Sequence, residues 1–229
     1  MWLNDAKVTE VMLHQHRQLL LQAHPNHVVI DGLFDPSMLD KVMQILHYPQ
    51  NWQGQKHTYS ALYVDQDQWQ ATDPSQRFVQ RDVWNRERGR ESSPSIAHDF
   101  LKYLRSEAFM AVLSRIFNVQ LTDLNVQDPM INSNYFRLNK DDFVEQHADD
   151  SPGREVCLLL YLNQTWQLGD GGELVFMGDR NTPIKISPIY NRCVLFDPSS
   201  KGSEHYVEKL NAQYGEAYRY NVTSWYWSE

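Results

Sequence analysis

Residues 155–176, EVCLLLYLNQTWQLGDGGELVF, show the pattern that decides the fold of this chain. A short apolar run is followed by a polar, glycine-rich segment and then by a second short apolar run. Similar runs recur from residue 120 onward, in NSNYFRL (132–138), RCVLF (192–196) and AYRYNVTSWYW (217–227). Short strands separated by Gly, Pro, Asp and Ser are typical of antiparallel sandwiches and barrels. The second half of the chain is therefore predicted to form a jelly-roll of two sheets.

The first half of the chain has helical patterns. In residues 8–23 apolar side chains recur every three or four positions, which predicts an amphipathic helix. Residues 35–46 predict a second helix, with Asp35 as its N-cap. Residues 94–117 predict a helical segment that is broken into two helices near Ser106, a suitable N-cap. These helices precede the strands and do not alternate with them, so we expect helical support for a β core and no α/β fold.

These patterns predict one α+β domain over residues 1–229, mainly a β core with supporting N-terminal helices. Residues 1–118 are expected to supply mainly helices and loops, with a short strand at HVVIDGLF (27–34), and residues 119–229 the jelly-roll core. The polar residues 50–92 have no clear period, and we expect long loops with room for one hairpin. Loops this long in a compact domain commonly serve binding. The sequence does not decide whether they cover the pocket as a lid or leave an open groove.

Composition excludes several functional classes. The chain has 21 basic and 29 acidic residues, a formal net charge of −8, so we expect no nucleic-acid partner. No apolar run is long enough to span a membrane, and the N-terminus is not a signal peptide. Cys157 and Cys193 lie in apolar runs and are expected to be buried thiols, which favours a reducing, cytoplasmic location. The sequence sets no expectation for the oligomeric state.

The segment DDFVEQHADD (141–150) suggests a metal site. His147 and Asp149 are two positions apart, so on a strand their side chains point to the same face. His205 is the only histidine beyond them in the β half and is the candidate for a third ligand. Two histidines and one carboxylate form the facial triad of non-haem iron(II) oxygenases. The alternative is that His147 is a solvated strand residue and His205 an ordinary loop residue. The flanking acids are expected to be solvated residues at the rim: Asp141, Asp142, Glu145 and Asp150.

The last predicted strand carries a positive charge on an unusual face. Arg219 and Thr223 lie on the same face of AYRYNVTSWYW. A buried guanidinium needs an acidic partner, and the carboxylate of a bound small molecule is one possibility. The other is that Arg219 lies at the strand edge and pairs with a surface acid such as Glu216. The residues alone leave these alternatives equal.

The order of motifs resembles the 2-oxoglutarate- and Fe(II)-dependent oxygenases, in particular their prolyl 4-hydroxylase-like branch. The order is H-x-D, Y-L-N-x-x-W, G-G-E-L, N-R-x-V-x-F, H and R-x-x-x-T-x-W, over about residues 130–227. HVVIDGLFDPSMLDKVMQIL (27–46) is also similar to the opening strand and helix of the family. The resemblance implies a double-stranded β-helix, another name for this jelly-roll. It also implies Fe(II), 2-oxoglutarate as co-substrate, O2 and, as a possible auxiliary reductant, ascorbate.

The resemblance assigns roles to six residues. His147, Asp149 and His205 would be the catalytic metal ligands, and Arg219, Tyr161 and Thr223 would bind the distal carboxylate of 2-oxoglutarate. Trp225 is expected to pack beneath the site and not to touch the substrate. Tyr135 is expected to be a core or interface aromatic, with contact to the co-substrate as its alternative. The interval from His205 to Arg219 is longer than in compact members of the family, so we expect an extended turn there.

The resemblance implies oxidative decarboxylation of 2-oxoglutarate to succinate and CO2, coupled to hydroxylation of a C–H bond. Asp149 favours hydroxylation, because the family's halogenases replace this carboxylate with a small residue. The first candidate substrate is a prolyl or other residue of a protein or peptide. The second is a free amino acid or a small biosynthetic metabolite. The third hypothesis, a non-catalytic metal-binding jelly-roll sensor, is disfavoured by the predicted dicarboxylate pocket.

Overall fold

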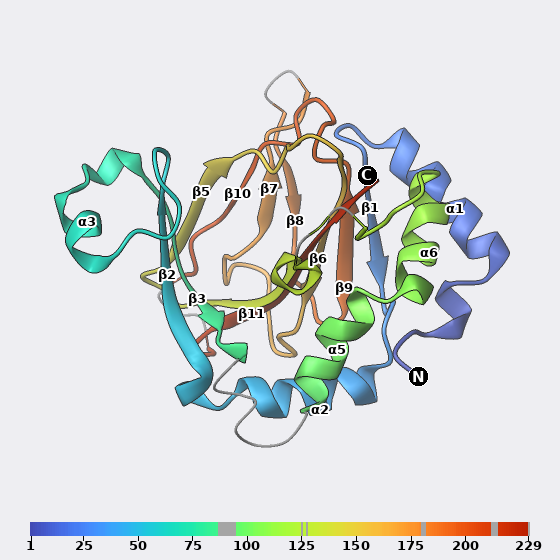
Figure 1. Ribbon diagram of the computed structural model, residues 1–229, viewed down its shortest axis with the longest axis horizontal. Coiled ribbons are helices and arrows are strands. Elements are labelled where there is room, and N and C mark those ends of the chain that lie inside the picture. The colour runs from blue at the N-terminus through green and yellow to red at the C-terminus, as the bar shows by residue number, and fades with distance from the viewer. Residues whose placement is uncertain (87–94, 125, 127, 180–181, 212–214, 229) are drawn as a thin grey trace.

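The computed structural model describes residues 1–86, 95–124, 126, 128–179, 182–211 and 215–228. Within these residues eleven strands form one curled, antiparallel sheet, with helices packed on one side of it (Figure 1). The strands are β1 His27–Asp31, β2 Trp52–Thr58, β3 Arg77–Trp84, β4 Ser133–Leu138, β5 Phe143–His147, β6 Arg154–Tyr161, β7 Leu174–Phe176, β8 Ile184–Ile186, β9 Arg192–Phe196, β10 His205–Val207 and β11 Arg219–Trp227. The predicted jelly-roll is confirmed.

The strand order brings distant segments of the chain together. The sheet runs β1-β9-β6-β11-β4-β3-β5-β10-β7-β8, and β2 pairs with β3 at the side. The last strand, β11, therefore lies between β6 and β4, with Thr223 opposite Leu159 on one side and Asn134 on the other. Strand β10 pairs with β5 so that His205 lies directly opposite His147. The curl of the sheet gives these strands a common concave face, and the site lies there.

Four of the helices cover the convex side of the sheet around β1, β4, β6, β9 and β11 (Figure 1). They are α1 Glu10–Gln22, α2 Pro36–Leu46, α5 Ile96–Leu104 and α6 Glu107–Phe117. Their boundaries follow the expected signals: the side chain of Asp35 accepts a hydrogen bond from the Met38 amide, and that of Ser106 accepts one from the Phe109 amide. The helices pack on the sheet through buried aromatic side chains, among them Phe34, Phe100, Phe109 and Tyr226. Burial of this apolar surface fixes the sheet from behind.

A second, smaller core fills the concave side at one end of the curled sheet. It contains Tyr161, Leu174, Phe176 and Phe196, all fully buried, together with Cys157. Cys193 belongs to the helix-side core. Both cysteines are buried free thiols, as predicted. This second core supports the strands that carry the candidate ligands.

Residues 50–92 are more ordered than a long loop. They contain the hairpin of β2 and β3, paired from Trp52 opposite Trp84 onward, and the short helix α3, Gln66–Ala71. Together with β1, this hairpin places three strands of the first 118 residues in the sheet, where mainly helices and loops were expected. Figure 1 shows that α3 lies away from the sheet, beyond β2 and β3. Residues 87–92 of the predicted loop region lie outside the described residues.

One expectation about the segment 141–150 was wrong. Asp142 is not a solvated residue at the rim but is 7% exposed. Its carboxylate accepts hydrogen bonds from the side chain of Gln80 and from the amide of Asn139. Asp142 therefore closes the turn between β4 and β5 and ties it to β3.

In the part of the chain that the structure describes, no helix combines the length and the apolar character needed to cross a membrane.

Candidate functional site

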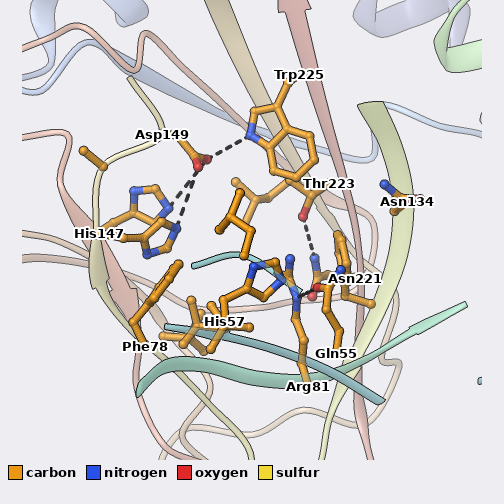
Figure 2. A pocket seen from close by; sticks show the side chains of 18 of the residues that line it. Gln55, His57, Phe78, Arg81, Asn134, His147, Asp149, Asn221, Thr223 and Trp225 are labelled. Atoms are coloured by element: carbon orange, nitrogen blue, oxygen red, sulfur yellow. Dashed lines mark hydrogen bonds and ion pairs between the residues drawn. The ribbon is translucent and has the colours of Figure 1, made fainter. Parts of the chain in front are cut away.

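The concave face of the sheet brings together His147, Asp149 and His205. One ligand atom from each of these residues lies within 4.8 Å of the others. Nε2 of His147 is 3.8 Å from Oδ1 of Asp149, and Nε2 of His205 is 3.9 Å from Oδ2 of the same carboxylate. Figure 2 shows the carboxylate facing both imidazole rings. Three residues that are distant in sequence thus form one cluster, as the sequence predicted.

The backbone sets which nitrogen of each imidazole faces the cluster. Nδ1 of His147 lies 2.9 Å from the carbonyl oxygen of Glu145, and Nδ1 of His205 lies 2.9 Å from that of Ser203. A carbonyl oxygen only accepts, so each Nδ1 carries the proton. Each Nε2 then presents its lone pair to the cluster, as a metal ligand requires. This two-histidine, one-carboxylate donor set fits Fe(II).

The carboxylate of Asp149 is oriented by Trp225. The indole Nε1 of Trp225 donates a hydrogen bond of 3.0 Å to Oδ2 of Asp149 (Figure 2). Burial alone would raise the pKa of the Asp149 carboxyl, but His205, His147 and this hydrogen bond outweigh burial and lower it. Burial and the neighbouring His205 also lower the pKa of His147, to about 4. The cluster is therefore ready to bind a cation at neutral pH, with an ionised carboxylate and an unprotonated His147.

Arg219 lies at the bottom of the same concave face. It is 1% exposed, and its guanidinium stands over the ring of Tyr161, 4.9 Å from the ring centroid. Nη1 donates to Oδ1 of Asn221, and Nδ2 of Asn221 donates to the hydroxyl of Thr223. The predicted group Arg219, Tyr161 and Thr223 is therefore brought together on β11 and β6. Glu216, the surface partner considered from the sequence, instead accepts hydrogen bonds from Asn163 and Thr165.

A glycine makes room for this arginine. Gly172 has a positive φ of 81°, and a Cβ built there would lie 2.8 Å from Cδ of Arg219. An alanine at this position would therefore combine an unfavourable backbone conformation with a clash against the guanidinium arm. The second glycine of the GGEL motif thus gives Arg219 the space that it occupies.

Tyr135 does not reach the site. Its side chain points to the helix side, is fully buried, and donates its hydroxyl to the carbonyl of Ala97. Trp225, expected only to pack beneath the site, donates a hydrogen bond to a candidate ligand, Asp149. One signal in the sequence pointed to this contact: Trp225 shares the face of Arg219 and Thr223.

The cavity around these residues has a volume of about 690 Å³. Its far wall comes from the β2–β3 hairpin, which contributes Gln55, His57 and Arg81 (Figure 2). Residues 58–63 of the same hairpin line the mouth, where the hydroxyl of Tyr59 donates to the carbonyl oxygen of Gln146. None of these residues was predicted as a site residue, because the sequence allowed for one hairpin in residues 50–92 but did not place its strands. Val79 and Arg81 are two positions apart on β3, so their side chains share the face that points into the cavity.

Comparison with known proteins agrees with this geometry. Residues 132–227 match the model of the 2OG-Fe(II) oxygenase superfamily. A search of curated proteins gives no match. The matched segment carries every candidate ligand and all three candidate carboxylate-binding residues, whereas the wall formed by Gln55, His57 and Arg81 lies outside it.

Solved structures support the fold over nearly the whole chain. A prolyl-4-hydroxylase from Pseudomonas putida is similar over 95% of this chain and 100% of its own, with a TM-score of 0.61 and 15% identity. A 2OG-Fe(II) oxygenase-family oxidoreductase from Burkholderia pseudomallei is similar over 96% of this chain and 93% of its own, with a TM-score of 0.62 and 14% identity. A prolyl hydroxylase from Trichoplax adhaerens was solved with a peptide fragment of the hypoxia inducible factor oxygen degradation domain. It is similar over 98% of this chain and 96% of its own, with a TM-score of 0.63 and 20% identity. At identities this low, the likeness supports the fold and not the substrate.

Proposed function

We propose that this chain, a 2-oxoglutarate- and Fe(II)-dependent oxygenase, hydroxylates a C–H bond in a residue of a protein or peptide, with a prolyl residue as the leading candidate. Succinate and CO2 would be the co-products. The observation that carries the polypeptide substrate is the mouth of the cavity, described below. The Trichoplax adhaerens enzyme was solved with a peptide fragment, so this fold is compatible with a polypeptide substrate.

His147, Asp149 and His205 would hold Fe(II) in this proposal. The bound metal would supply the activation of O2 that couples oxidation of 2-oxoglutarate to hydroxylation. The chain's own contribution is orientation: the carbonyls of Glu145 and Ser203 fix the two imidazole rings, and Trp225 fixes the carboxylate. Groups that orient ligands in this way typically contribute about 10–100-fold to metal affinity.

Arg219 would bind the distal carboxylate of 2-oxoglutarate, with Tyr161 and Thr223 beside it. A guanidinium and a carboxylate form a strong, two-point hydrogen-bonded pair. The low exposure of Arg219 increases the value of such a pair, because water competes weakly for it. The arrangement also places the carboxylate site deep in the cavity and leaves the mouth for the substrate.

The mouth of the cavity is unusually apolar for a surface. Tyr59, Leu62, Tyr63 and Ile131 all line the cavity and are 53%, 63%, 73% and 62% exposed. Exposed large apolar side chains gathered at one place mark a binding surface, and aromatic residues are enriched where proteins bind other chains. A free amino acid bound near the metal would leave most of this surface uncovered, whereas a polypeptide would cover it.

The proposal is tested by succinate formation and mass detection of a +16 product, with Fe(II), 2-oxoglutarate, ascorbate and O2 present. Proline-containing peptide pools and free amino acids are offered in separate assays. We expect oxygen-dependent succinate without any substrate, an increase with peptides, and loss of both in Asp149→Ala. Cys193→Ala should match the wild type. Stimulation by free amino acids alone would replace the polypeptide substrate with a small one. Undiminished turnover by Asp149→Ala would refute the assigned ligand set.

A further inference from the structure

Arg81 is a cavity residue that the proposed reaction does not use. Its guanidinium lies flat over the ring of Phe136, with Cζ 3.5 Å from the ring centroid, and its Nε donates a 2.8 Å hydrogen bond to Oε1 of Gln55. Both contacts fix the plane of the guanidinium, and Figure 2 shows Arg81 beside Gln55. No carboxylate of the described residues forms an ion pair with Arg81, and Nη1 and Nη2 make no hydrogen bond to them. The two terminal nitrogens are therefore available to a ligand in the cavity.

The charges that line the cavity do not balance. Three arginines, Arg81, Arg154 and Arg219, line it together with a single carboxylate, Asp149. The two positive charges of Fe(II) and the two negative charges of 2-oxoglutarate would cancel, so the loaded cavity keeps an excess of positive charge. The whole chain, in contrast, has a formal net charge of −8. The excess is thus local to the cavity and favours an anionic ligand there.

Two of the three arginines have other tasks. Arg219 is the group proposed for the distal carboxylate of 2-oxoglutarate. Arg154 donates from Nη1 to the backbone carbonyl of Asp149, and its guanidinium lies 4.9 Å from the ring of Trp227 and 5.7 Å from that of Trp225. Arg81 is the remaining guanidinium: Gln55 and Phe136 hold it, and the charge of Asp149 acts on it without an ion pair between the two.

His57 lies in the same wall as Arg81 and has hydrogen-bonding capacity to spare. It is 6% exposed, and neither ring nitrogen has a hydrogen-bond partner among the described residues. Its ring packs between Tyr63 and Phe78, at centroid distances of 4.8 and 5.8 Å. Burial, and after it the charge of Arg81, lower the pKa of His57 to about 4, so the ring is neutral and carries one N–H donor. Buried polar atoms are nearly always hydrogen-bonded, which favours a ligand that bonds to this ring.

We propose that Arg81 and His57 form a subsite that binds a carboxylate of the substrate. The inference rests on the proposed hydroxylase function and names the class of substrate: one that presents a carboxylate close to the C–H bond to be hydroxylated. Arg81 receives the charge through its two terminal nitrogens, and the neutral imidazole donates one further hydrogen bond. The carboxylate is either an acidic side chain next to the target residue of a peptide or the α-carboxylate of a free amino acid.

Matched ligand pairs test this subsite by calorimetry under argon, on protein loaded with Fe(II) and 2-oxoglutarate. One pair is N-acetyl-L-proline and N-acetyl-L-prolinamide; the other is a blocked proline peptide with either glutamate or glutamine beside the proline. We expect the wild type to bind the carboxylate member of a pair about 10–100-fold more tightly, the range expected for a hydrogen-bonded charge pair. In Arg81→Gln this ratio should fall to about one. The pair that shows the preference identifies the source of the carboxylate.

Three variants separate the subsite from general effects. Arg77→Gln removes an arginine from the same strand, one that donates to the carbonyl of Thr72 outside the cavity, and should keep the full preference. Arg81→Lys keeps the charge without the two-point geometry and should keep part of it. His57→Phe should lower carboxylate affinity several-fold and leave amide affinity unchanged.

Several results would overturn the subsite. A wild type without carboxylate preference in either pair, including one that binds neither pair, contradicts it, as does an undiminished preference in Arg81→Gln. A weakened affinity of Arg81→Gln for 2-oxoglutarate would assign Arg81 to the co-substrate instead. Substrate-independent succinate formation is measured alongside in the wild type and in the control Arg77→Gln, and should be equal in these two proteins. Its absence from both proteins refutes the proposed function, whereas carboxylate preference reports on the subsite separately.

Discussion

Strand β3 carries two neighbouring charged residues with opposite environments. Asp82 points to the convex side, where its carboxylate accepts a 2.8 Å hydrogen bond from Nε of Arg137. Arg137 is in turn enclosed by the rings of Tyr218 and Trp52, at 3.8 and 4.6 Å. Arg81 points to the concave side and forms no ion pair with a carboxylate of the described residues. On one side of the sheet the protein satisfies its own charges; on the other it leaves a charge for a ligand.

Other residues show the same contrast between paired charges on the convex side and available donor atoms on the concave side. On the convex side Arg105 is bound by the carboxylate of Asp123, the hydroxyl of Ser224 and the carbonyl oxygen of Trp225. On the concave side the candidate metal ligands present three donor atoms to a common point. Burying charged and polar groups without partners costs free energy. On the concave side, binding of metal, co-substrate and substrate would remove that cost, because the ligands would supply the missing partners.

The largest expected effect is on stability, from Arg105→Met on the convex side. This change leaves the largely buried Asp123 without its partner, and breaking a buried ion pair costs about 3–5 kcal/mol. Urea denaturation should show this loss, while the apparent KM for 2-oxoglutarate in the remaining folded protein stays close to the wild-type value. An unchanged free energy of unfolding would mean that the convex-side pair is not structural, and the contrast between the two sides would fail.

A smaller effect, on binding of 2-oxoglutarate and not on stability, is expected from Arg219→Ala. Loss of the guanidinium should raise the apparent KM for 2-oxoglutarate about 10–100-fold, since hydrogen bonds to charged groups contribute about 1.5–3 kcal/mol. The melting temperature should change little, because the variant also relieves the cost of a buried charge. The measurement is succinate formation over a range of 2-oxoglutarate concentrations, with Arg77→Gln as control. An unchanged KM would assign the distal carboxylate to another residue.

Much of this site could be predicted because it depends on local spacing. His147 and Asp149 are two residues apart on a strand, and the same alternation places Arg219 and Thr223 on one face of β11. The third candidate ligand, His205, followed from its position as the last histidine of the β half. Ser106 and Asp35 marked helix boundaries for equally local reasons.

The parts that could not be predicted depend on pairing between distant segments. The hydrogen bond from Trp225 to Asp149 and the fit of Gly172 against Arg219 require the register of strands far apart in sequence. Arg81 and His57 were not predicted because residues 50–92 lack a clear period, so the sequence allowed for one hairpin without placing its strands. The burial of Asp142 follows from its bond to Gln80 on β3, a strand whose position the sequence did not predict.

The central claim is that His147, Asp149 and His205 bind Fe(II) in a cavity that also binds 2-oxoglutarate. Anaerobic titration of the protein with Fe(II) and 2-oxoglutarate tests it most directly, because chelation of the metal by the co-substrate gives a visible absorption band. The wild type should develop the band only when both components are present. His205→Ala, with one ligand removed, should show none at the same concentrations, and Cys193→Ala should behave like the wild type. A wild type without the band, or a band of full intensity in His205→Ala, would contradict the account.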